Sequence, residues 1–194
     1  MKTLLVTAAL AATALSTSAI AQSRPDILIV DSDRVLTDCT ACKAANTQLQ
    51  QRQEALKSRA QTLQNQLQTE GKPLQTAVDA LDGKEPDAAL KARIDAFETK
   101  QRNASQELSN GQQTLQSTVA HVQQQIGSKL VSVVEQVRAR RGASVVMAKN
   151  STIANDNAVD VTSEVLTGLN QQLPSVSVTP LPQQQSQSKQ PQGR

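Results

Sequence analysis

Apolar side chains recur every seven residues through the middle of the chain, beginning near residue 43. One register holds Leu49, Leu56 and Leu63. A second register, four residues out of phase, holds Ala60, Leu67, Leu74 and Leu81. Because a seven-residue repeat gathers apolar side chains along one stripe of a helix, this pattern predicts a coiled-coil helix to about residue 81.

The stripe of this first helix is interrupted by polar residues. Asn46, Gln53 and Glu70 stand at positions that a tight coiled coil fills with apolar side chains. The run Gly71-Lys72-Pro73 follows, and proline lacks a backbone donor and clashes with the preceding helical turn. The sequence therefore predicts a loosely packed seam with a kink or break at residues 71–73.

Residues 82–87 predict a chain reversal, since Asp82-Gly83 is typical of a turn and Pro86 suits the first turn of a following helix. The heptad pattern then continues to about residue 141. Its apolar stripe widens beyond Val122, which predicts burial on more than one side. Two helices joined by a short turn form an antiparallel hairpin, here with a polar tip and an apolar base.

Two short β-branched runs, residues 27–31 and 144–148, bracket this hairpin in the sequence. Both predict buried strands, and they must meet at the base of the hairpin because they flank it. A short helix capped by Ser32 or Asp33 follows the first strand, and a last helix covers about residues 161–172.

The predicted fold class is mainly α with a small β part, in which a long antiparallel coiled-coil hairpin arm stands on a small α/β body. The expected division is a signal peptide at 1–21, the first part of the body at 22–42, the arm at 43–141, the second part of the body at 142–173 and a disordered tail at 174–194. Such a small body buries little apolar surface alone, so its strands are expected to assemble in an oligomer. The residues expected at that contact are Ile27, Ile29, Val145 and Val146.

The first 21 residues have the pattern of a cleaved export signal. Lys2 supplies the positive start, residues 4–15 form the apolar run, and Ala19-Ile20-Ala21 forms the small-x-small cleavage site. The apolar run is shorter than the ~20 residues that a membrane-spanning helix needs. The mature protein is therefore expected to begin near Gln22, outside the cytoplasm.

Composition and charge narrow the classes of function. Phe97 is the single aromatic residue and the net charge is only +3, so nucleic-acid binding by stacking and basic patches is not expected. His121 is the only histidine, and no P-loop or dinucleotide-binding motif occurs. The sequence predicts neither an enzyme nor a bound cofactor or metal.

Cys39-Thr40-Ala41-Cys42 forms a C-x-x-C motif. An oxidising compartment favours a local disulfide between the two cysteines, with free thiols or a redox or metal-binding role as the alternatives. A catalytic thiol needs a lowered thiolate pKa, and the neighbouring carboxylate of Asp38 works against that.

The order of these parts resembles the Skp/OmpH family of periplasmic chaperones. The resemblance rests on Ile27-Leu28-Ile29-Val30-Asp31, Asp33-Arg34-Val35-Leu36, Lys43-Ala44-Ala45, residues 143–147 and residues 157–166. It implies a periplasmic homotrimer whose strands build a shared body and whose three arms enclose unfolded outer-membrane proteins without using ATP. It also implies contact with lipopolysaccharide or the membrane surface. The family is strongly basic, whereas this chain is only mildly basic.

The first hypothesis is therefore an ATP-independent holding chaperone for unfolded outer-membrane β-barrel proteins. Apolar residues of the arm are the candidates for client contact, with the core of the coiled coil as their alternative role. These residues are Leu63, Leu67, Leu74, Ile94 and Phe97. The other hypotheses are a periplasmic coiled-coil spacer or adaptor and, third, a thiol oxidoreductase using Cys39 and Cys42.

Overall fold

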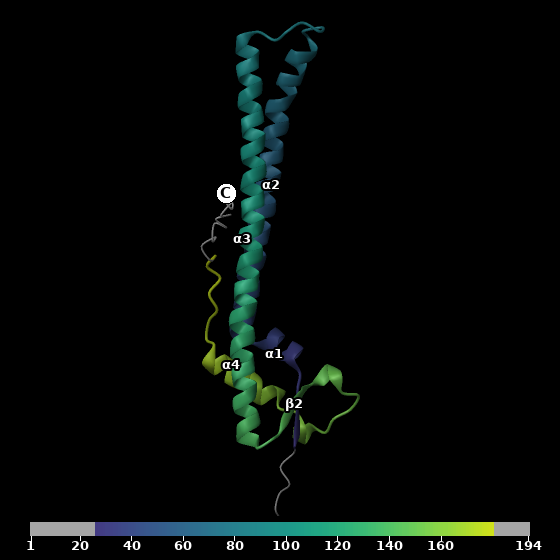
Figure 1. The fold of residues 1–194 in the computed structure, drawn as a ribbon, viewed down its shortest axis with the longest axis vertical. Helices are drawn as coiled ribbons and strands as arrows, with labels where there is room; N and C mark the ends of the chain where they lie inside the picture. Colours follow the sequence, from purple (N-terminus) through teal and green to yellow (C-terminus); the bar gives the residue numbers. More distant parts are fainter. Residues whose placement is uncertain (1–25, 181–194) are drawn as a thin grey trace, which may run out of the picture.

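The computed structural model describes residues 26–180, and it shows a long helical hairpin standing on a small body (Figure 1). The fold class expected from the sequence, mainly α with a small β part, is confirmed. The predicted signal peptide at 1–21 lies outside the described residues, as does the end of the chain after residue 180. No helix of the described part is both long enough and apolar enough to cross a membrane.

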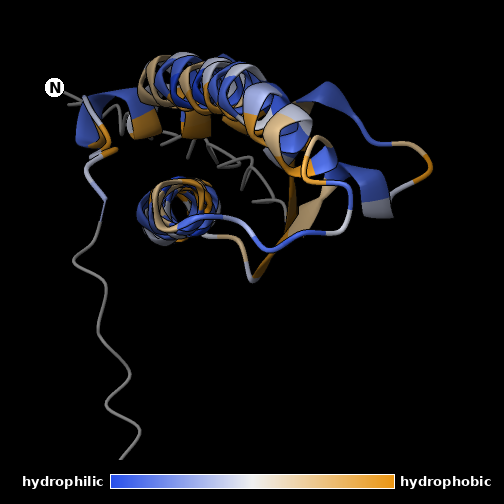
Figure 2. Cartoon of the chain, turned by 90° about the horizontal axis from the view of Figure 1, so that it is seen from above, coloured by the Kyte–Doolittle hydropathy of each residue, from blue (hydrophilic) through white to orange (hydrophobic). Residues whose placement is uncertain are grey.

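Two helices form the arm, α2 over Thr40–Asp79 and α3 over Ala88–Arg141. Asp87 begins α3, where its side-chain carboxylate accepts a hydrogen bond of 2.7 Å from the backbone N–H of Leu90. Gly142 ends it in the left-handed conformation, with φ at 68°, which glycine adopts without a steric penalty. Many residues along the helices are hydrophilic, with apolar residues among them (Figure 2).

Helix α2 runs through Pro73 without a break, so the predicted interruption at residues 71–73 is wrong in that respect. A proline inside a helix costs about 3 kcal/mol relative to alanine, but it removes a single backbone hydrogen bond. The residues after Pro73 keep their packing against α3, since Leu74 is only 9% exposed. The seam contacts on both sides of the proline therefore hold the helix together.

The two strands, β1 over Ile27–Val30 and β2 over Val145–Ala148, pair in parallel, with Ile27 opposite Val145. Across β1 from β2, Ile29 forms an isolated parallel bridge with Asp160. The strands bracket the hairpin in sequence and meet at its base in space, as the sequence predicts.

Short helices cover the sheet. Helix α1, Ser32–Asp38, is capped by Asp31, whose carboxylate accepts a 2.9 Å hydrogen bond from Arg34 N–H, and not by Ser32 or Asp33. Two short 3₁₀ helices, Lys149–Ser151 and Asn157–Val159, lie in the loop after β2. Helix α4, Thr162–Gln172, closes the body, and its Glu164 pairs with Arg140 and Arg141 at the end of α3, at 2.9 Å each.

The core lies where α3, α4, α1 and the inner face of the sheet meet. Its most buried members are all 0% exposed: Leu28, Val35, Cys39, Val137, Val165 and Leu169. These residues come from both ends of the described chain, so the body forms only when the hairpin has closed.

Residues 174–180 correct another expectation. The disordered tail was predicted from residue 174, but the segment from Leu173 to Pro180 lies extended along α3 (Figure 1). Val178 is 9% exposed and belongs to the apolar core cluster. Residues 175–179 alternate polar and apolar side chains, and the segment is held by its contacts with α3.

Candidate functional site

The five residues expected to contact clients all lie on the arm, and the structure places the most buried of them in the seam between the helices. Leu63 is 7% and Leu74 is 9% exposed. Leu67, Ile94 and Phe97 are half-buried. The latter three therefore present apolar surface to solvent while the arm stays closed.

Glycine residues in the seam accept large side chains from the facing helix. A Cβ atom at Gly71 would lie 2.9 Å from Cζ of Phe97, and one at Gly111 would lie 2.7 Å from Cδ1 of Leu56. These are closer than ordinary van der Waals contacts, so the absence of a side chain makes room for Phe97 and Leu56. The sequence predicts a break at Gly71, because a heptad does not show which residue faces a glycine.

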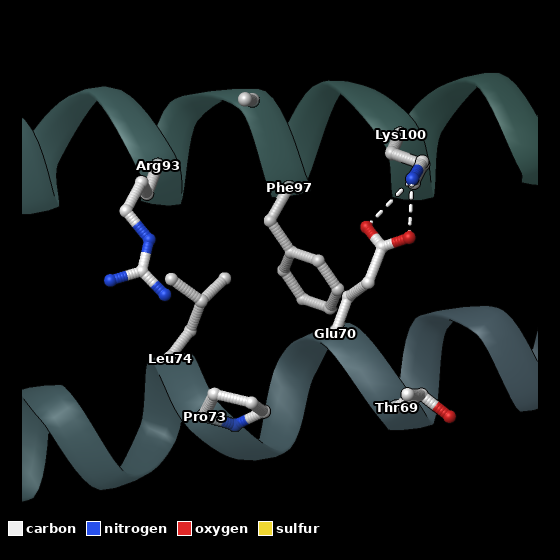
Figure 3. Close-up of a pocket in the computed structure, with 8 residues that line it drawn as sticks. Thr69, Glu70, Pro73, Leu74, Arg93, Phe97 and Lys100 are labelled. Carbon is white, nitrogen blue, oxygen red and sulfur yellow. Dashed lines mark hydrogen bonds and ion pairs between the residues drawn. The ribbon is translucent and has the colours of Figure 1, made fainter.

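A cleft of about 470 Å³ opens between the helices near the tip of the arm. Its apolar part comes from Pro73, Leu74 and Phe97, and Figure 3 shows the ring of Phe97 pointing from α3 toward α2. On one side Lys100 Nζ contacts both carboxylate oxygens of Glu70, at 2.5 and 2.6 Å. An apolar floor with charged groups at its rim suits an apolar side chain of a peptide with polar neighbours.

A second cleft, of about 390 Å³, lies at the base of the arm. Its apolar walls are Leu36, Leu49, Val122, Ile126 and Leu130. No client contact was expected there. The widened apolar stripe beyond Val122, from which the sequence predicts burial on more than one side, is the signal that could have located this cleft.

Charged pairs across the seam fix the register of the helices. Arg59 donates two hydrogen bonds, of 2.6 and 3.0 Å, to the carboxylate of Glu107. The hydrogen bonds from Arg59 hold the pKa of Glu107 below its ordinary value, and the same bonds raise the pKa of Arg59. Both side chains are exposed, so their contribution is to register more than to stability.

Part of the positive charge of the arm is unpaired. Lys91 contacts Glu85 at 3.4 Å near the turn. Lys72, Lys84 and Arg93 form no ion pair with the rest of residues 26–180. These groups remain available to acidic partners within the ~8 Å that physiological salt allows.

Cys39 and Cys42 are joined by a disulfide at the junction of α1 and α2, with their Cα atoms 5.1 Å apart. Cys39 caps α2, and its sulfur accepts a hydrogen bond from Cys42 N–H at 3.1 Å. The two residues are 0% and 2% exposed. Since thiol exchange requires access to a sulfur, this burial argues against a thiol oxidoreductase.

The strand residues expected at the oligomer contact divide between the two faces of the sheet. Ile29 is 3% exposed but lies on the same face as Ile27, opposite Met147, whereas Val146 on the other face packs against the core. Ile27 and Val145 are 48% and 47% exposed in the single chain, and their place at an oligomer contact stays a prediction. Met147 at 37% extends the same outward apolar face.

Comparison with known proteins agrees with this architecture. The sequence matches the family described as outer membrane protein (OmpH-like) over residues 26–169. The crystal structure of an OmpH-like protein from Caulobacter crescentus CB15, described as an outer membrane chaperone, has a TM-score of 0.69 and 18% identity. The similarity covers 83% of this chain and 93% of that chain, and at this identity it shows a shared fold. No curated protein matches the sequence. The chain belongs to the OmpH-like outer membrane protein family.

Proposed function

We propose that this protein is an ATP-independent periplasmic holding chaperone that binds unfolded outer-membrane β-barrel proteins and prevents their aggregation. Family membership supports a chaperone role in general. The observation that carries the specific role is the arm: two helices of 40 and 54 residues that extend far beyond the core and keep half-buried apolar side chains in open clefts. The sequence contains no nucleotide-binding motif, which fits holding without ATP.

The contacts with clients are expected to be weak and adaptable. An unfolded β-barrel strand exposes an apolar residue at every second position. Leu67, Ile94 and Phe97 offer partly exposed apolar surface to such strands, whereas contact with Leu63 or Leu74 requires the helices to part. Loose contacts of this kind accept many sequences, which a holding chaperone needs.

The active form is proposed to be a homotrimer. A two-stranded sheet is marginal by itself, and here Ile27, Val145 and Met147 leave its outer face apolar and exposed. Strands from further subunits would cover this face and complete the sheet. Three arms held by one body would then surround a client. Contact of the body or arms with lipopolysaccharide or a membrane surface stays an expectation, and the net charge of +3 gives it little electrostatic support.

Export by a signal peptide cleaved after about residue 21 would bring the protein to the periplasm. The disulfide between Cys39 and Cys42 is compatible with that oxidising compartment.

A spacer or adaptor between envelope proteins is the second candidate. The continuous helix through Pro73 favours it, because an unbroken arm is a better strut than a broken one. A spacer would bind folded partners and ignore unfolded clients.

The test is the mass of the mature protein in solution, measured by light scattering, alone and with a urea-unfolded β-barrel client after dilution. The proposal predicts three chains alone and a soluble complex of three chains with one client. A trimer that binds folded envelope proteins but leaves the unfolded client to precipitate would favour the spacer.

A further inference from the structure

The segment after α4, residues 173–180, belongs to no helix or strand and lies extended along α3 (Figure 1). Val176 and Val178 face the protein, half-buried and 9% exposed, while Ser175, Ser177 and Thr179 are exposed. Inward and outward positions thus alternate as they do in a strand. We call this segment the strap.

The side chain of Gln125 on α3 holds the strap by its backbone. Its amide group donates to the carbonyl of Ser177 at 2.9 Å and accepts from the N–H of Ser177 at 3.0 Å. The same two hydrogen bonds would be made by a peptide group of a neighbouring strand. Every non-proline residue carries this donor and acceptor, so the contact with Gln125 does not depend on the identity of the clasped residue.

The two hydrogen bonds with Gln125 and the apolar contacts of the strap together define a recognition pattern. The residue that Gln125 binds points outward, and its two neighbours, Val176 and Val178, point inward to the core cluster. The site therefore fits an extended segment with apolar side chains at alternate positions. Strands of outer-membrane β-barrels have this alternation in their sequences.

The strap is held lightly enough to be displaced. Within residues 26–180, none of positions 174–180 takes part in a backbone–backbone hydrogen bond. Besides the two hydrogen bonds with Gln125, the strap has a 2.8 Å hydrogen bond from Leu173 N–H to the Leu169 carbonyl at the end of α4. It also has a local one of 3.3 Å from Thr179 N–H to the hydroxyl of Ser177. Exchange of the strap for another extended segment would leave the helices and the sheet in place.

We propose that the face of α3 around Gln125 is a binding site for extended client segments with alternating apolar residues, and that the strap occupies it as an internal competitor. This rests on the proposed function, because it names the part of the chaperone that grips a client. A client must displace the strap, so its apparent dissociation constant is inversely proportional to the fraction of protein in which the strap is undocked.

The experiment uses full-length mature protein and a fluorescent synthetic peptide spanning residues 173–180. The undocked variant carries Val176→Asp with Val178→Asp, which places charges at the inward positions. Its matched control carries Ser175→Asp with Thr179→Asp, the same charge at outward positions. Circular dichroism checks that each protein keeps its helices.

The peptide should bind the undocked variant about tenfold more tightly than the parent or the matched control, the ratio expected if the strap is docked nine-tenths of the time. Adding Gln125→Ala to the undocked variant should weaken the peptide several-fold, and Gln124→Ala, at an exposed neighbouring position, should not. An unfolded β-barrel client should compete with the peptide.

Equal affinity in all three proteins, or no effect of Gln125→Ala, would overturn the inference. Peptide binding without competition by the client would also overturn it, since the site would then serve only the chain's own tail. A higher oligomeric mass of the undocked variant would assign the site to a second copy instead. Each of these results leaves the proposed function standing if the parent still suppresses client aggregation. Loss of that suppression in the parent itself would refute the proposed function.

Discussion

Shortening the arm without disturbing the body should separate holding from assembly. Deleting residues 62–75 and 93–106 removes 14 residues from each helix, so the helices stay in antiparallel register above the retained Arg59–Glu107 pair. Each deletion is close to four helical turns and shortens the arm by about 21 Å. Since α2 has 40 residues and is about 60 Å long, the arm loses roughly a third of its length.

The deletion removes the tip cleft and all five expected client contacts, and it leaves the turn at residues 82–87 intact. The core residues that join α3 to α4, among them Val137 and Leu169, keep their contacts. The melting midpoint of the body should therefore change by no more than about 5 °C. The oligomeric mass per chain should be unchanged. The concentration of protein needed to suppress client aggregation by half should rise several-fold.

The assay is light scattering by an unfolded β-barrel protein diluted from urea, with the oligomeric state checked on the same samples. A full-length arm carrying Leu74→Ala and Phe97→Ala is the control that keeps the length and removes the apolar wall of the cleft. If the shortened protein assembles normally and suppresses aggregation as well as the parent, the arm is not the holding element and the reasoning fails.

Three further predictions concern the body. Replacing both Cys39 and Cys42 by serine should lower the free energy of unfolding by only about 1–2 kcal/mol, because the disulfide closes a very short loop. Suppression of client aggregation should stay intact. Loss of that suppression with the trimer preserved would favour the thiol hypothesis. Val145→Asp should abolish assembly while circular dichroism still reports folded helices. Ile29→Asp, at a site 3% exposed, should instead unfold the body because it buries a charge. A trimeric Val145→Asp protein would contradict the first expectation. Hydrogen bonds from Arg140 and Arg141 lower the pKa of Glu164, so its contribution is present above the ordinary carboxyl pKa and is lost as the pH falls through the lowered value. Denaturant titrations should show Glu164→Gln less stable by about 0.5–1 kcal/mol at neutral pH and equal to the parent at strongly acidic pH, and a constant difference would refute the assignment.

Local periodicity was enough to predict the hairpin and the sheet. The heptad pattern predicts that the first arm helix begins at about residue 43, and in the structure it begins at Thr40. The pattern is informative because its repeat shows which side of the helix is buried. The strands could be paired without a structure, since two apolar runs on either side of a closed hairpin have one place to meet. The parallel register of Ile27 with Val145 depends on the body and was not predicted.

Features that depend on contacts distant in sequence were missed. The sequence predicts a helix break at Gly71, whereas in the structure Phe97 packs against this glycine. Nothing in the residues around Gly71 identifies that partner. The strap looked like the start of a disordered tail for the same reason, because Ser177 is held by Gln125, 52 positions away. The expected client contacts all lie on the arm, and their division into buried and half-buried residues follows from side-chain packing between α2 and α3.

The proposed function of the protein is to keep unfolded outer-membrane proteins soluble without ATP. The most direct measurement is light scattering after a urea-unfolded β-barrel protein is diluted into nucleotide-free buffer with increasing amounts of the mature protein. For a holding chaperone, scattering should fall to the buffer level near one trimer per client, and the held client should fold when lipid vesicles are added. Scattering that is unchanged by an excess of correctly folded protein would contradict it.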